Sequence, residues 1–435
     1  MGGERWEDKG DLNTARPGDV RSSFDAENSG GRWYPSLITL PDGRVLALGG
    51  HPLEGDRRHT NVSLEVYDPA AGAWMLVGAV DYPNIPGAAE VPERTNHSEY
   101  PRAHVLRDGT VFVASNMADG AVHKWIPSAD PLAWTRVADG PPAGYRGNPQ
   151  PYTTVLLPLD HQREYAPTVL ICGRQTAYTL QPLAGTVGGD PPWIPTGGRT
   201  LPGSPVRQYP LASLLPTGEV FVSGGTTTGN DVDALLAAEM YDPADNSWRT
   251  LSEATRVRNY HSTALLLPNG AVWHSGSNED CQPGPASRDL TVEIYQPWYF
   301  CWDRPRISGV TSRACPGETL NIETPDADEI TEVVLIRCGS FTHAFNPDQR
   351  LVSIPFRRST EMSTLLIASV PGNTVLIPGY YLLFLRTANG VPSEGRFVQI
   401  CRSQSERVFK ARPSWWTRML EIADLIATEQ SNVDR

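Results

Sequence analysis

Three short segments, far apart in the sequence, carry side chains that could do chemistry. They read GRWYP from Gly31, RNYHS from Arg258 and FTHAFNPDQR from Phe341. Their phenol and imidazole groups belong to Tyr34, Tyr260, His261 and His343. Such groups can bind metals and transfer protons, so these segments are the first candidates for a functional site.

Each of these residues also has a structural alternative. Tyr34 could simply pack in a core, since Tyr209 occupies an equivalent place elsewhere with no evident role. Neighbouring residues of a strand point to opposite faces, so Tyr260 and His261 can share a site only if the backbone bends between them. His343 is harder to explain as structural, because its loop has little reason to carry THAFNPDQR unless it reaches another part of the protein.

An internal repeat must position the first two segments. LPDGRVLALGG from Leu40 recurs as LRDGTVFVASN from Leu106, LPTGEVFVSGG from Leu215 and LPNGAVWHSGS from Leu267, with a degenerate copy from Leu156. Each copy predicts two strands joined by a two-residue turn, because Asp-Gly and Asn-Gly favour tight hairpins. A third strand and a closing tryptophan follow most copies, and units of about 50 residues are typical of kelch blades.

The pattern predicts an all-β protein with two main domains. Short alternating strands after the Pro-rich stretch WDRP indicate an immunoglobulin-like sandwich. Apolar residues at helical spacing near the C-terminus indicate a short amphipathic helix that could dock on the body or on a partner. The predicted units are an irregular segment over 1–30, a kelch β-propeller of about five blades over 31–302, the sandwich over 303–402 and a tail with the helix over 403–435.

The composition argues against several classes of function. The net charge is −12 and no block of Lys or Arg occurs, so nucleic acid is not an expected partner. No apolar run approaches the roughly 20 residues of a membrane-spanning helix. The first residues contain no apolar segment of the kind found in secretory signals.

The cysteines do not indicate whether the protein works in an oxidising or a reducing compartment. None of the six lies in a CxxC pair, so we expect no zinc site. They could form disulfides or be buried thiols. The two candidate pairs are Cys281 with Cys301 and Cys315 with Cys401.

In this order, the three segments resemble the metal-binding motifs of the galactose oxidase and glyoxal oxidase family. The resemblance runs from about Gly31 to Gln399 and includes GYYLLFL and GVPSEGRF in the sandwich. It implies a kelch propeller followed by a sandwich, and an oxidase that uses copper and O2. Family members are secreted or lie at the cell surface, which is what the resemblance suggests for localisation.

The resemblance also implies roles for individual residues around one copper ion per chain. Tyr260 matches the axial tyrosine and Tyr34 the equatorial one. His261 and His343 match the equatorial imidazoles. Two imidazoles and two phenolates suit Cu(II), which favours tetragonal nitrogen and oxygen ligands, and binding should strengthen as the pH rises. Tyr260 would take the proton of the substrate hydroxyl, and Tyr34 would carry the radical.

The chain departs from the family in two respects. The family links the tyrosine matched by Tyr34 to a cysteine through a thioether, whereas the first cysteine here is Cys172, so no thioether is expected. The family propeller also has seven blades. Three explanations remain open: a truncated reading frame, a reduced homologue that binds copper without the thioether, and a pseudoenzyme.

The second departure concerns an aromatic residue. Pro52, beside His51, stands where galactose oxidase has a tryptophan that covers the thioether. Glyoxal-oxidase-like members lack that tryptophan too, which favours small aldehydes or simple alcohols over galactose.

Three hypotheses of function follow. The first is a copper-dependent oxidase of aldehydes or primary alcohols that consumes O2 and releases H2O2. The second is an inactive or truncated propeller homologue that binds carbohydrate or protein surfaces as a scaffold. The third is a chain that binds copper for storage or structure and releases no H2O2.

Overall fold

The structure is a computed structural model, and it describes residues 32–50, 63–79, 99–114, 121–125, 127, 134–142, 145, 152–184, 191–278 and 289–403. The predicted N-terminal segment 1–30, the C-terminal helix, His51, Pro52 and Cys281 lie outside these residues. The predicted all-β class is confirmed, because the described elements are β-strands and a few single-turn 3-10 helices. No helix in the described ranges is long and apolar enough to cross a membrane.

Five antiparallel sheets follow one another along the chain as far as residue 295. Four of them have four strands and the fifth has three. Their strands are β1 (Ser36–Thr39), β2 (Val45–Leu48), β3 (Ser63–Asp68) and β4 (Ala73–Ala79); β5 (Ala103–Val105), β6 (Val111–Val113), β7 (Ala121–Trp125) and β8 (Trp134–Asp139); β9 (Thr153–Leu156), β10 (Val169–Cys172), β11 (Tyr178–Leu180) and β12 (Ile194–Pro195); β13 (Leu211–Leu214), β14 (Val220–Ser223), β15 (Ala237–Asp242) and β16 (Ser247–Glu253); and β17 (Thr263–Leu266), β18 (Val272–Ser275) and β19 (Val292–Tyr295). The short helices here are η2 (His161–Arg163) and η3 (Asp231–Asp233).

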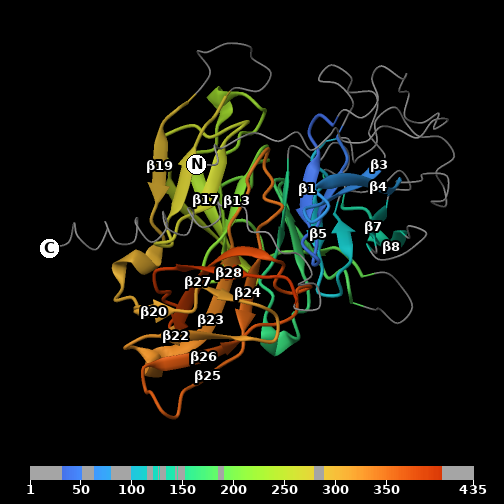
Figure 1. Ribbon diagram of the computed structural model, residues 1–435. Helices are drawn as coiled ribbons and strands as arrows, with labels where there is room; N and C mark the ends of the chain where they lie inside the picture. The colour runs from blue at the N-terminus through green and yellow to red at the C-terminus, as the bar shows by residue number, and fades with distance from the viewer. Residues whose placement is uncertain are drawn as a thin grey trace, which may run out of the picture.

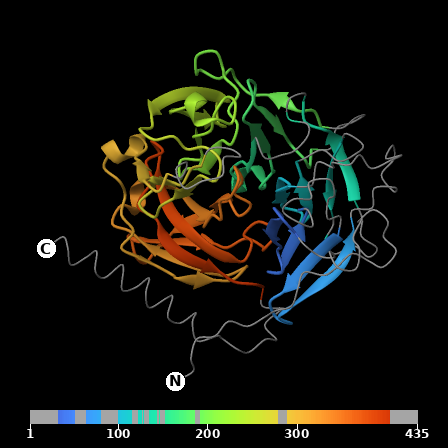
Figure 2. The same ribbon diagram turned by 90° about the horizontal axis from the view of Figure 1, so that it is seen from above.

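The five sheets form an open arc. In Figure 2 they follow one another from blue through teal and green to yellow-green, and the orange and red strands of the C-terminal region appear in the remaining sector. In Figure 1 those C-terminal strands lie below the five sheets. Among the described residues the sheets do not close into a ring, so the kelch propeller itself stays a prediction.

The hairpin turns contain three residues rather than the predicted two. In the first turn, the Leu40 amide donates to Arg44 O and the Gly43 amide donates to Leu40 O, both at 2.8 Å. This is a turn followed by a residue in the left-handed region, where glycine has no steric penalty. The Asp42 carboxylate accepts from the Arg44 amide at 3.0 Å, which explains the polar residue before the glycine. The four turn glycines have φ of +80° at Gly43, +82° at Gly109, +91° at Gly218 and +85° at Gly270.

The C-terminal region forms a two-sheet sandwich, as predicted. One sheet has the strand order β20-β22-β26-β25 and the other β21-β28-β27-β23-β24. The elements are η5 (Trp298–Cys301), β20 (Gly309–Val310), β21 (Arg313–Ala314), β22 (Thr319–Glu323), η6 (Ala327–Glu329), β23 (Ile330–Arg337), β24 (Leu351–Ile354), β25 (Phe356–Arg358), β26 (Leu365–Ser369), β27 (Gly379–Thr387) and β28 (Arg396–Ile400).

One predicted strand is in fact two. The segment LVSIPF divides at Pro355 into β24 and β25, which belong to different sheets of the sandwich. Proline has no amide hydrogen for a strand ladder, so the chain can leave one sheet and cross to the other at this residue.

Strand β23 connects the sandwich to the arc of sheets because it is buried on both faces. Val333 and Leu335 belong to the core of the sandwich. Val334 and Ile336 pack instead in a cluster with Leu214 of β13. A strand buried on both sides appears in sequence as a continuous apolar run, as this one does. The packing directs the loop that follows β23 toward the middle of the arc.

A disulfide closes the sandwich. Cys315, next to β21, is bonded to Cys401, just after β28. This confirms one of the two candidate pairs. Cys172 and Cys338 are free thiols, Cys172 being fully buried.

Removing this disulfide should destabilise the sandwich. The bond spans 86 residues of sequence, and cross-links that close long loops stabilise mainly by restricting the unfolded chain. We expect Cys315→Ser with Cys401→Ser to lose about 2–4 kcal/mol of unfolding free energy. Urea unfolding of the oxidised wild type and the double variant measures the loss, and coincident curves would contradict the expectation.

Candidate metal centre

A buried arginine anchors the chain just before each candidate tyrosine. Arg32 donates to Gly49 O at 2.8 Å and forms an ion pair with Glu65 in which both side chains are fully buried. Arg258 likewise donates to Gly276 O at 2.9 Å and lies 3.4 Å from Glu293. Both arginines precede a candidate tyrosine by two residues, so these contacts fix the backbone that carries Tyr34 and Tyr260.

The backbone at Tyr34 and at His261 is in the left-handed region. Tyr34 has φ of 66° and His261 has φ of 64°, values that are uncommon for residues other than glycine. At His261 this bend brings the ring to 3.8 Å from the Tyr260 ring, measured between centroids. The predicted bend between Tyr260 and His261 is therefore present, and it lets two neighbouring residues face one site.

The loop after β23 carries His343 into the middle of the arc. Gln349 accepts from the Leu214 amide at 2.7 Å and donates to Ala212 O at 3.2 Å, both in β13. The buried Arg102, beside β5, donates to the carbonyl oxygen of His343 at 3.2 Å. The loop is therefore held from two different sheets, which explains why a sandwich loop carries this polar sequence.

The structure brings the four candidate residues together. The hydroxyl oxygens of Tyr34 and Tyr260 are 2.8 Å apart. The His343 ring lies 4.6 Å from the Tyr34 ring, 5.1 Å from the Tyr260 ring and 4.5 Å from the His261 ring, between centroids. Three segments, the first and last of which are more than 300 residues apart in sequence, thus meet at one place.

Both imidazoles use one ring nitrogen in a local hydrogen bond. Nδ1 of His261 lies 2.7 Å from Oδ1 of Asn278, and Nδ1 of His343 lies 2.6 Å from Oγ1 of Thr342. Nε2 of His343 is buried and has no hydrogen-bond partner among the described residues. Burial, followed by the nearby His261 and Arg102, lowers the pKa of His343 to about 3, so its imidazole is neutral above acid pH.

These residues fit a transition metal that accepts nitrogen and oxygen ligands. A buried, unpartnered imidazole nitrogen is costly unless something binds it. Two imidazoles and two phenolates are a donor set that suits Cu(II), and they are not the thiolate-rich set typical of structural zinc. Within the described ranges, no three His, Cys, Asp or Glu residues gather into a further metal site.

Sequence reasoning missed two neighbours of this cluster. Tyr100 stacks on Tyr34 at 5.1 Å and on His343 at 4.4 Å, between ring centroids. Tyr209 packs at 5.1 Å from the Tyr260 ring, so it also borders the cluster. Both begin a sheet in the left-handed region, as Tyr34 does. Their equivalent place in the repeat was the available signal, but it does not show which tyrosines meet.

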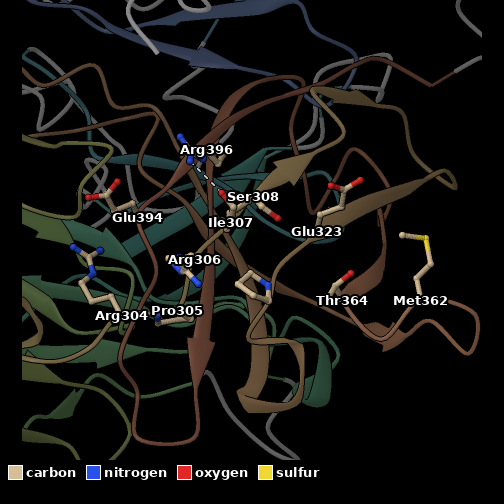
Figure 3. Close-up of a pocket in the computed structure, with 11 residues that line it drawn as sticks. Arg304, Pro305, Arg306, Ile307, Ser308, Glu323, Met362, Thr364, Glu394 and Arg396 are labelled. Carbon is tan, nitrogen blue, oxygen red and sulfur yellow. Dashed lines mark hydrogen bonds between the residues drawn. The ribbon is translucent and has the colours of Figure 1, made fainter. Parts of the chain in front are cut away.

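A large surface pocket lies elsewhere. It lies on the sandwich (Figure 3). Its volume is about 740 Å³. Two of its arginines are occupied structurally, because Arg304 donates to three backbone carbonyls and Arg396 donates to Ile307 O. Its lining contains no histidine, tyrosine or cysteine; it comprises Arg304, Pro305, Arg306, Ile307, Ser308, Glu323, Pro325, Met362, Thr364, Glu394 and Arg396.

Comparison with known proteins agrees with the motifs. Residues 304–400 match the family model of the galactose oxidase-like early set domain. The predicted resemblance of the chain to the galactose oxidase and glyoxal oxidase family is thereby confirmed and, as the relatives below show, extends beyond this domain.

Relatives match most of the chain at low identity. The aldehyde oxidase GLOX of Vitis pseudoreticulata is 29% identical over 413 residues, which cover 86% of this chain and 73% of that protein. A galactose oxidase of Gibberella zeae is 26% identical over 403 residues, which cover 85% of this chain and 54% of that protein. The chain thus spans about half the length of this galactose oxidase. A solved fungal alcohol oxidase in complex with copper matches with a TM-score of 0.68 at 22% identity, over 85% of this chain and 76% of that one, and supports the fold.

Proposed function

We propose that this chain binds one copper ion through Tyr34, Tyr260, His261 and His343 and oxidises small aldehydes or primary alcohols with O2. The observation that carries the proposal is the buried Nε2 of His343, which lies among two phenols and a second imidazole and has no hydrogen-bond partner in the part of the chain that the structure describes. The relatives named as aldehyde, galactose and alcohol oxidases make this chemistry the first to test.

Copper, when bound, would accept one of the two electrons that the substrate loses, and the Tyr34 radical that the resemblance implies would accept the other. The chain supplies the rest. For a primary alcohol the overall reaction is RCH2OH + O2 → RCHO + H2O2, so two electrons and two protons pass from the alcohol to O2. Tyr260, as a phenolate, would accept the hydroxyl proton of the substrate, and its oxygen lies 2.8 Å from that of Tyr34, with which it could share the proton.

The test is a titration of the purified chain with Cu(II), followed by EPR spectroscopy and an H2O2 assay. We expect one copper per chain with a tetragonal signal, and H2O2 release with O2 and a small aldehyde or primary alcohol. Copper binding without H2O2 would point to storage or a structural role. If no specific copper signal appeared, the oxidase proposal would fail and a scaffold function would take its place.

A further inference from the structure

A neutral imidazole carries one ring proton, and metal binding through Nε2 requires that proton to be on Nδ1. For His261 the position of this proton is set by Asn278, whose side-chain oxygen lies 2.7 Å from Nδ1 and can only accept. His343 differs, because its Nδ1 faces the hydroxyl of Thr342 at 2.6 Å, and a hydroxyl can either donate or accept. Something else must therefore decide which way the Thr342 hydroxyl points.

Tyr100 is the residue in place to decide it. Burial raises the pKa of Tyr100 to about 12, and hydrogen bonding with the Thr342 side chain opposes that rise. Its ring lies nearly parallel to that of His343, with an interplanar angle of 22° and centroids 4.4 Å apart. The same ring stacks on Tyr34 at an interplanar angle of 27°. Tyr100 is also buried, so water does not compete freely for these contacts.

We propose that Tyr100 and Thr342 are positioning residues that hold His343 with its proton on Nδ1 and its Nε2 lone pair directed at the metal. Thr342 donates its proton to the Tyr100 oxygen and accepts the Nδ1 hydrogen of His343. In the opposite orientation Thr342 would donate to Nδ1, and the ring proton would be on Nε2. Nε2 would then have no lone pair with which to bind copper. The inference rests on the proposed copper site and adds the residues that make His343 competent as a ligand.

Thr342→Val tests this relay, by which we mean the chain of hydrogen bonds from Tyr100 through Thr342 to His343. Valine keeps the shape of threonine and removes only the hydroxyl. The measurement is the Cu(II) dissociation constant, obtained by competition with a chelator, together with the EPR spectrum. We expect Thr342→Val to weaken binding by about 10–100-fold, the effect usual for a partner that orients a metal ligand. Thr342→Ser, which restores the hydroxyl, should bind within about 2-fold of the wild type, as expected when the relevant hydrogen bond is retained.

Tyr100→Phe tests the relay independently, should Thr342→Val not fold. It keeps the stacked ring, removes the oxygen and should weaken binding by about 2–10-fold, the worth of one hydrogen bond. Wild-type affinity and an unchanged spectrum in a folded Thr342→Val or Tyr100→Phe variant would overturn this inference and leave the copper site standing. A wild type that binds no copper would overturn the proposed function and this inference together.

Discussion

Replacing His343 with alanine is expected to abolish specific Cu(II) binding. His343 is the more buried of the two histidines, and its Nε2 has no hydrogen-bond partner among the described residues. Losing a direct ligand should weaken binding by more than about 100-fold, beyond the loss that follows removal of a supporting partner. Competition with a chelator measures the dissociation constant, and the EPR signal should lose its tetragonal form.

The matched control is His161→Ala. His161 lies in η2, where its ring bonds the Ser353 hydroxyl at 3.0 Å, and it belongs to none of the contacts of the candidate centre. Its removal should leave the copper affinity unchanged. If both variants kept wild-type affinity, copper would bind elsewhere and the assignment of His343 as a ligand would be wrong. Thermal unfolding of both variants separates a lost ligand from a lost fold.

Replacing Glu239 with glutamine is expected to give the largest loss of stability. Its carboxylate lies 2.5 Å from Arg199 and 3.0 Å from Arg207, and all three side chains are at most 4% exposed. Glutamine keeps the shape but leaves two buried guanidinium groups without their counter-charge. Breaking a buried ion pair in this way costs about 3–5 kcal/mol of unfolding free energy, which urea unfolding can measure.

The same variant should change the dependence of stability on pH. Burial alone would raise the pKa of Glu239, but the hydrogen bonds and charges of Arg199 and Arg207 outweigh it and lower the pKa. This stabilisation is present above the unfolded pKa of about 4.3 and is lost as the pH falls through the lower folded value. The difference between wild type and variant should therefore shrink below about pH 4. Glu253→Gln, an exposed position in the same sheet, is the control, and an equal loss there would contradict the argument.

Local patterns in the sequence determined the strands and the chemical types of the candidate site. Repeated Asp-Gly and Asn-Gly turns gave the hairpins, although the loops have three residues because the glycine follows a turn rather than sitting within a two-residue one. Alternating apolar residues predicted the strands of the sandwich, but not the change of sheet at Pro355. The Tyr and His motifs identified the candidate site residues, because each motif is a short stretch of consecutive residues that can be recognised without the structure.

Only the tertiary structure decided which of these residues meet. Because β23 is buried on both faces, the loop that follows it brings His343 from the sandwich into the arc of sheets. No local sequence pattern shows that this loop reaches the other segments. Tyr34, Tyr100 and Tyr209 occupy equivalent places in the repeat, yet they contact different members of the cluster because each begins a different sheet around it. The role that we propose for Thr342 was equally hidden, because it depends on Tyr100, a residue distant in sequence. The sequence by itself therefore determined which groups could do chemistry, and the packing of distant segments decided their partners.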